Sequence, residues 1–114
     1  MASFKVEGGL RLKGEITPQG AKNEALQILS AVLLTPEPVT INNIPDILDV
    51  NLLIDLLEDL GVKFNRIDRH TCVFEARDVQ LDKLEDPEFQ KNSSRLRGSV
   101  MIAGPLLARY KKAF

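Results

Sequence analysis

The stretch "PDILDVNLLIDLLEDLG", residues 45–61, carries the strongest helical pattern in the chain. Its leucines recur at the three- and four-residue spacing that places side chains on one face of a helix; they are Leu52, Leu53, Leu56, Leu57 and Leu60. We expect Asp46 and Asp49 to accept hydrogen bonds from the free N–H groups at the helix start, and Gly61 to follow its end. The pattern therefore predicts an amphipathic helix whose leucine face lies in a core.

Short segments with the alternation of β-strands flank this helix on both sides. Residues 39–44 ("VTINNI") precede it, and residues 62–67 ("VKFNRI") and 71–76 ("TCVFEA") follow it. Polar residues 68–70 suit a turn between the last two segments. We therefore predict a strand before the helix and two strands after it.

An earlier helix is predicted over residues 21–34, because the prolines at positions 36 and 38 cannot continue a helical hydrogen-bond ladder. Before it, residues 3–8 ("SFKVEG") and 10–17 ("LRLKGEIT") also alternate as strands do. The predicted order completes a β-α-β-α-β-β unit, and the fold class is α+β (α/β).

A third helix is predicted over residues 93–109, after a polar stretch that begins at position 77. Pro105 removes one hydrogen bond of the helical ladder, so we expect a kink or a close helix contact at Gly104. Residues 112–114 ("KAF") suggest the opening of another strand. We therefore expect the chain to be a fragment of a larger protein.

Composition limits the classes of function. The 114 residues are enough for one small domain with its own core, and the apolar share of 44% is typical of globular proteins. Fifteen basic and sixteen acidic residues give a net charge of -1, which disfavours non-specific nucleic-acid binding. The single cysteine suits a reducing compartment, and no apolar run approaches the length of a membrane span. We therefore expect a cytoplasmic protein that does not bind membranes.

Lys22 is the first residue whose position suggests chemistry. With Asn23 it follows Gly20 and lies in the predicted first turn of the helix over 21–34. A cation there meets the positive end of the helix dipole, which costs a little energy unless an anion binds. Gly20 is expected to let the backbone approach such a ligand closely. The alternative is an ordinary lysine that extends into water.

Arginines repeat this arrangement in the predicted third helix. Arg95 and Arg97 follow two serines that could cap the helix start. A planar guanidinium can bind a phosphate or carboxylate through two parallel hydrogen bonds, which favours Arg97 as an anion ligand. The alternative is a surface salt bridge from Arg97 to Asp86 or Glu88, which would contribute little. Two such helix starts indicate a shared anion pocket.

Cys72 and His70 receive no functional role. Cys72 lies within an apolar strand pattern, where a small buried thiol is the common outcome. His70 lies in a predicted turn, and no second Cys or His stands at the spacing of a zinc site.

Three segments resemble the enolpyruvyl transferase family and, within it, the UDP-N-acetylglucosamine 1-carboxyvinyltransferases. They are "LKGEITPQGAKNEALQILSAVLL" (12–34), "PVTINNIPDILDVNLLIDLLEDLGVKF" (38–64) and "LRGSVMIAGPLLARY" (96–110). The resemblance implies a larger enzyme of two domains, each an inside-out α/β barrel of β-α-β-α-β-β repeats. One unit and the start of a second are then present: residues 1–20 belong to the other domain, and residues 21–114 form part of one barrel.

The resemblance also implies an activity. Members transfer an enolpyruvyl group from phosphoenolpyruvate to the 3′-hydroxyl of UDP-N-acetylglucosamine and release phosphate, in the first committed step of peptidoglycan synthesis. The reaction passes through a tetrahedral intermediate, and neither metal nor organic cofactor is expected. Lys22 and Asn23 match the family's phosphoenolpyruvate site, and Arg97 matches an arginine associated with the UDP-sugar.

The family's proton donor, a cysteine or an aspartate, is expected beyond Phe114, and Cys72 does not match it. We therefore assign no catalytic residue to this chain and expect it to be inactive alone. Two alternatives stay open: a non-catalytic module that binds phosphorylated ligands or a partner, and the sister family that makes 5-enolpyruvylshikimate 3-phosphate. Unpaired strand edges also suggest self-association.

Overall fold

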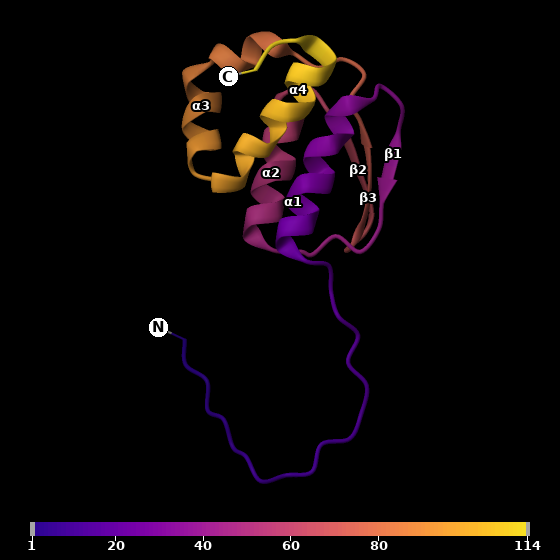
Figure 1. Ribbon diagram of the computed structural model, residues 1–114, viewed down its shortest axis with the longest axis vertical. Helices are drawn as coiled ribbons and strands as arrows, with labels where there is room; N and C mark the ends of the chain where they lie inside the picture. The colour runs from indigo at the N-terminus through magenta and orange to yellow at the C-terminus, as the bar shows by residue number, and fades with distance from the viewer. Residues whose placement is uncertain (1, 114) are drawn as a thin grey trace.

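The computed structural model describes residues 2–113, which form one α+β domain with an extended N-terminal arm (Figure 1). Three antiparallel strands make a sheet in the order β1-β3-β2, and the helices cover one of its faces (Figure 1). The strands are β1 (Val39–Ile41), β2 (Lys63–Asp68) and β3 (Thr71–Glu75). The strand predictions over 39–44, 62–67 and 71–76 are therefore confirmed, with β1 shorter than expected.

The central strand β3 anchors the sheet to the core. Cys72 and Phe74 point into the core and are almost fully buried. Phe74 lies opposite Val39 on one side and Phe64 on the other, and the two phenylalanine ring centroids are 5.3 Å apart. Such cross-strand aromatic pairs stabilise a sheet beyond simple burial.

Helix α2 (Leu48–Asp59) carries the leucine face that the sequence predicts. Leu53, Leu56, Leu57 and Leu60 are buried, and Leu52 is half-buried at the edge of the core. Gly61 follows the helix with φ +97°, a left-handed conformation that favours glycine. These predictions are confirmed.

The predicted N-terminal caps of α2, Asp46 and Asp49, are wrong. The residue at the N-cap is Ile47, and no side chain caps the helix. Asp46 instead accepts hydrogen bonds from Asn51 Nδ2 and Arg69 Nε, both at 3.0 Å. Asp49 lies inside the first turn, where its carboxylate receives the ammonium of Lys22. Both carboxylates therefore bind side chains of other elements or later turns rather than the free N–H groups.

Helix α1 (Lys22–Ala31) continues as a 3₁₀ segment, η1 (Val32–Leu34), so the helix predicted over 21–34 is confirmed. Leu29 and Leu33 of this segment are fully buried. Arg109 of a later helix ties the segment to the sheet, since its Nη1 donates to the carbonyls of Leu33, at 3.0 Å, and Ala76, at 2.6 Å.

The third helix predicted over 93–109 is not one continuous helix, although α4 and a 3₁₀ segment lie within that range. The structure has α3 (Pro87–Ser94), a 3₁₀ segment η3 (Arg97–Ile102) and α4 (Ala103–Tyr110), preceded by the 3₁₀ segment η2 (Leu81–Glu85). Asp86 caps α3 by accepting from the N–H of Glu88, and Pro87 occupies the first helical position. An Asp-Pro helix start therefore lies within the stretch that polarity alone suggested was irregular.

Pro105 causes no kink inside a long helix. It lies in the first turn of α4, where the missing N–H would have had no partner in the helix. No atom lies within 4 Å of a Cβ built on Gly104, so the expected close contact is absent within the described residues. Residues 112 and 113 form no strand, and Phe114 lies outside the described residues.

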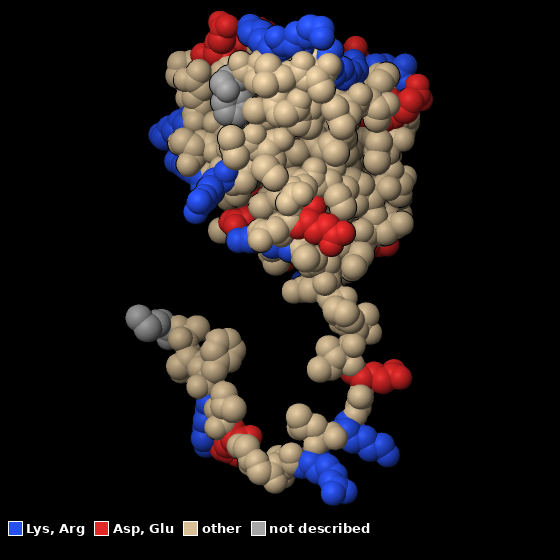
Figure 2. Space-filling model, viewed as in Figure 1, with Lys and Arg blue, Asp and Glu red and all other residues tan. Residues whose placement is uncertain are grey.

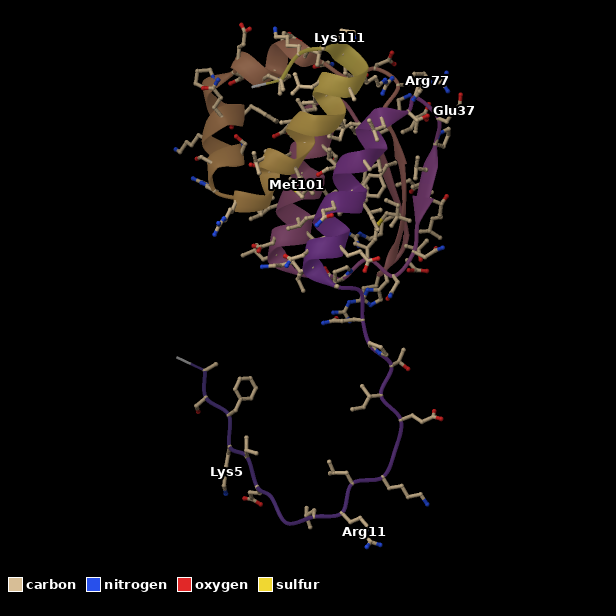
Figure 3. All side chains as sticks on the ribbon, viewed as in Figure 1. Lys5, Arg11, Glu37, Arg77, Met101 and Lys111 are labelled. Atoms are coloured by element: carbon tan, nitrogen blue, oxygen red, sulfur yellow. The ribbon has the colours of Figure 1, made fainter. Side chains whose placement is uncertain are left out.

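The strands predicted over 3–8 and 10–17 are also wrong within the described structure. Residues 2–19 are exposed and unpaired, and they hang away from the domain as an arm (Figure 1). The alternating apolar side chains of the arm are all at least 79% exposed: Phe4, Val6, Leu10, Leu12 and Ile16. Figure 3 shows Lys5 and Arg11 on the same arm. A strand requires a hydrogen-bonded neighbour, and residues 2–113 provide none for the arm.

The arm enters α1 at Gly20, which packs against the loop after β1. A Cβ at this position would collide with the Asn43 carbonyl oxygen and would lie 3.0 Å from Cδ of Pro45. The close approach that requires glycine is therefore to the protein's own backbone, and the expectation that Gly20 serves a ligand is not supported by the geometry. Within residues 2–113, no helix is both long and apolar enough to cross a membrane.

Replacing Gly20 by alanine should destabilise the domain by about 1–3 kcal/mol, the usual cost of forcing extra atoms into a packed site. The matched control is Gly104→Ala, which meets no atom and should stabilise α4 by roughly 0.5–1 kcal/mol. Urea unfolding of both variants measures the difference. Equal stability of Gly20→Ala and the wild type would contradict this packing.

The buried thiol of Cys72 should react slowly with iodoacetamide in the native chain. Burial raises the pKa of Cys72, and its side chain is 0% exposed. Because the unfolded chain ionises this thiol at lower pH than the folded chain, Cys72 should also favour unfolding as the pH rises above the ordinary pKa of a thiol. Mass spectrometry after alkylation at pH 8, with and without urea, measures how accessible the Cys72 thiol is in the folded and the unfolded chain. Fast labelling without urea would show that the thiol is accessible.

Candidate functional site

A pocket of about 530 Å³ opens between the start of α1 and the segment η3. The polar and charged side chains at its wall are Lys22, Asn23, Gln27, Asp49, Arg95 and Arg97. The structure therefore brings together Lys22, Asn23 and Arg97, which are far apart in the sequence. Figure 1 shows why: α1 and α2 both begin at the lower end of the domain, and the chain reaches η3 at the same end after α3.

Lys22 is the first residue of α1, and so lies in the first turn of the helix as the sequence predicts. The N-cap is Ala21, and no side chain caps the helix start. The first N–H groups of the helix therefore keep their capacity to bind an acceptor. The Lys22 ammonium lies 3.1 Å from Oδ2 of Asp49, and both side chains are about half exposed (49% and 41%).

The two arginines lie at different places from those predicted. Arg95 is the C-cap of α3, where the helix dipole favours a cation, and Arg97 begins η3. The serines expected to cap a helix at this point end α3 instead, and they donate to the carbonyls of Gln90 and Lys91. Neither arginine therefore lies in the first turn of an α-helix, although both line the pocket.

Arg97 has no carboxylate partner within residues 2–113. The alternative of a salt bridge to Asp86 or Glu88 does not occur among these residues, and Asp86 instead caps α3. The Arg97 guanidinium thus keeps its hydrogen-bonding capacity for a planar acceptor such as a phosphate or carboxylate.

Gly98 allows η3 to approach α1 and so closes one side of the pocket. A Cβ on Gly98 would lie 2.8 Å from Cδ1 of Leu26, a buried residue of α1. Sequence reasoning assigned no role to Gly98. The glycine directly after the arginine in "LRGS" was the available signal, but the neighbour that it must accommodate is visible only in the fold.

The charges of the pocket favour an anion. Three cations, Lys22, Arg95 and Arg97, face one carboxylate, Asp49. Cationic side chains and uncapped helix N–H groups are the usual ligands of phosphoryl and carboxylate groups. Sequence reasoning missed Asp49 as a pocket residue, because it assigned this carboxylate to the capping of α2.

Cys72 and His70 belong to the scaffold and lie outside this pocket. Cys72 is buried beneath the sheet, and the Nδ1 of His70 lies 2.8 Å from the carbonyl oxygen of Ile44. The N–H of Ile44 in turn donates to the His70 carbonyl, so the pair links the loop after β1 to the β2–β3 turn. Among residues 2–113 no group of three or more His, Cys, Asp or Glu side chains is arranged to hold a metal ion.

Comparison with known proteins gives a consistent result. The chain is 59% identical over 110 residues to a UDP-N-acetylglucosamine 1-carboxyvinyltransferase of Porphyromonas gingivalis, covering 96% of this chain and 25% of that protein. It is 58% identical over 113 residues to the protein of the same name from Bacteroides fragilis, covering 99% and 26%. A Bradyrhizobium diazoefficiens protein of that name is 44% identical over 106 residues, covering 93% and 24%.

The chain thus spans about a quarter of the length of the curated relatives that it matches. Residues 6–114 also match the family described as EPSP synthase (3-phosphoshikimate 1-carboxyvinyltransferase). This match includes α1, α2, the sheet and η3, and therefore every element that lines the pocket. The chain belongs to the EPSP synthase family.

Proposed function

We propose that this chain forms one wall of the substrate site of a UDP-N-acetylglucosamine 1-carboxyvinyltransferase. The observation that carries the proposal is the pocket in which Lys22, Asn23 and Arg97 meet. Relatives that are 58–59% identical bear this enzyme's name. That level of identity favours the UDP-sugar enzyme over the sister enzyme that makes 5-enolpyruvylshikimate 3-phosphate. The reaction would join phosphoenolpyruvate to the 3′-hydroxyl of UDP-N-acetylglucosamine and release phosphate, as a step of peptidoglycan synthesis.

Each wall residue has a role that suits its chemistry. Lys22 and Asn23, at the uncapped start of α1, would bind the negative charges of phosphoenolpyruvate. Arg97 would bind the UDP-sugar, whose diphosphate matches the parallel N–H groups of a guanidinium. Fixed cations of this kind lower the barrier mainly by orienting reactants and by stabilising charge as it develops.

Within the described residues no cysteine lines this pocket, and Asp49, the one carboxylate at its wall, is paired with Lys22. The hydroxyl oxygen of the sugar would add to C2 of phosphoenolpyruvate as the hydroxyl gives its proton to a base and C3 takes up a proton to become a methyl group. Loss of one methyl proton from C3 and of phosphate from C2 would then restore the double bond and complete the transfer. Cys72 lies away from the pocket and is fully buried. We therefore expect the 114-residue chain alone to bind substrate without turning it over.

The exposed apolar surface supports the larger architecture that the family resemblance implies. Figure 2 shows that the face over α1 and α4 is largely free of charged side chains. Ile28 of α1 and Leu107 of α4 are 43% and 52% exposed. In a barrel of β-α-β-α-β-β repeats, with the sheet outside and the helices inside, this face would pack against neighbouring repeats.

The alternating arm suits a strand of another sheet, which agrees with assigning residues 1–20 to the second domain. Its apolar side chains and the outer edges of β1 and β2 would also allow self-association of isolated chains.

The single buried thiol suits the cytoplasm, where we place the enzyme.

Replacing Arg97 by alanine should weaken binding of UDP-N-acetylglucosamine to the chain by roughly tenfold or more, the usual effect of losing hydrogen bonds to a charged group. The matched control is Arg77→Ala, because Arg77, which is labelled in Figure 3, lies outside the pocket. Its guanidinium pairs with Glu75. Isothermal titration calorimetry measures both. Equal affinity of the Arg97→Ala variant and the wild type would remove Arg97 from the site.

A further inference from the structure

The ion pair between Lys22 and Asp49 joins two helices at the pocket wall. Lys22 is the first residue of α1, where the helix dipole opposes its charge. Asp49 lies in the first turn of α2, where the dipole favours a carboxylate. The distance from Nζ to Oδ2 is 3.1 Å, and both residues line the same pocket. The helix dipoles therefore favour the charge of Asp49 and disfavour that of Lys22.

Stability does not account for this pair. Exposed ion pairs contribute about 0–1 kcal/mol to folding, because water screens them and the long side chains lose entropy. About half of each side chain is exposed here. The position of the pair suggests a role in ligand binding instead. Among residues 2–113, Asp49 is the one carboxylate that lines the pocket, beside the cations Lys22, Arg95 and Arg97.

Without a partner, a lysine at this position would extend into water, since its ammonium is strongly hydrated and its stem has many rotamers. The ammonium has three N–H donors, and the contact with Asp49 uses one of them. Two donors stay directed away from the carboxylate. An oxyanion in the pocket can accept them while Asp49 keeps its own hydrogen bond.

We propose that Asp49 is a positioning residue, which holds the Lys22 ammonium at the pocket wall in the orientation that binds a phosphoryl group. This inference rests on the proposed function of the pocket as an anion site. Asp49 would otherwise only repel an anionic ligand. The Lys22 side chain then loses its conformational entropy already in the free protein, so that this loss does not weaken ligand binding.

The two roles of Asp49 predict opposite results. As a mere negative charge near an anion site, Asp49 would weaken phosphate binding, so Asp49→Asn would tighten it. As a positioning residue, Asp49 strengthens binding through Lys22, so Asp49→Asn should weaken it by about two- to tenfold, the range expected from freeing one long side chain.

The experiment titrates the 114-residue chain with inorganic phosphate and with phosphoenolpyruvate, using wild type and the variants Asp49→Asn, Asp49→Glu, Lys22→Ala and Lys22→Ala/Asp49→Asn. Asp46→Asn is the matched control, because Asp46 lies three residues earlier and pairs with Arg69 outside the pocket. Thermal unfolding of each variant verifies the fold, and Asp49→Asn should leave the midpoint nearly unchanged.

We expect Asp49→Asn to weaken phosphate binding, Asp49→Glu to recover part of it, and Asp46→Asn to leave it unchanged. In the Lys22→Ala background, Asp49→Asn should cause no further loss. Unchanged or tighter binding by Asp49→Asn, with weaker binding by Lys22→Ala, would overturn the inference alone. Unchanged binding by Lys22→Ala would overturn the proposed function as well.

Discussion

The burial of the leucine face of α2 is the constraint on which the rest of the structure depends. Leu53 and Leu57 are fully buried, and each such side chain contributes roughly 1.5–3 kcal/mol relative to exposure. The helix packs against α1, α3 and η3. This packing brings the starts of α1 and α2 to one end of the domain, so that Lys22 and Asp49 meet there. The pocket wall is therefore a consequence of how the core packs.

The sequence predicts this core well, because its signals are local. Leucine spacing and Gly61 define α2, prolines end the first helical segment, and alternation marks β2 and β3. Among the predictions that fail, those of the arm and of the third helix have clear physical reasons. The arm alternates like a strand, but pairing depends on a neighbour that alternation does not reveal. The third helix divides into α3, η3 and α4, because Asp86 and Pro87 start a helix earlier than the apolar pattern suggests.

The candidate site was only partly predictable. Helix-start reasoning pointed to Lys22 and Asn23, and the family resemblance, which the match to the EPSP synthase family confirms, indicated Arg97, although Arg97 begins a 3₁₀ segment rather than an α-helix. Asp49 could not be identified, because its contact with Lys22 spans 27 positions and its place in a helix start suggested capping. Gly98 was missed for a similar reason, since the need for glycine there arises from Leu26 on another element.

The most direct test of the account is to map anion binding residue by residue. Phosphoenolpyruvate is added to the ¹⁵N-labelled chain, and the backbone amide resonances are followed by NMR. The largest shifts should occur at Lys22, Asn23 and the start of η3 near Arg97. The groove beside Lys83, on another part of the surface, should change little. Shifts that avoid the start of α1, or that concentrate beside Lys83, would contradict the claim that α1 and η3 form an anion site.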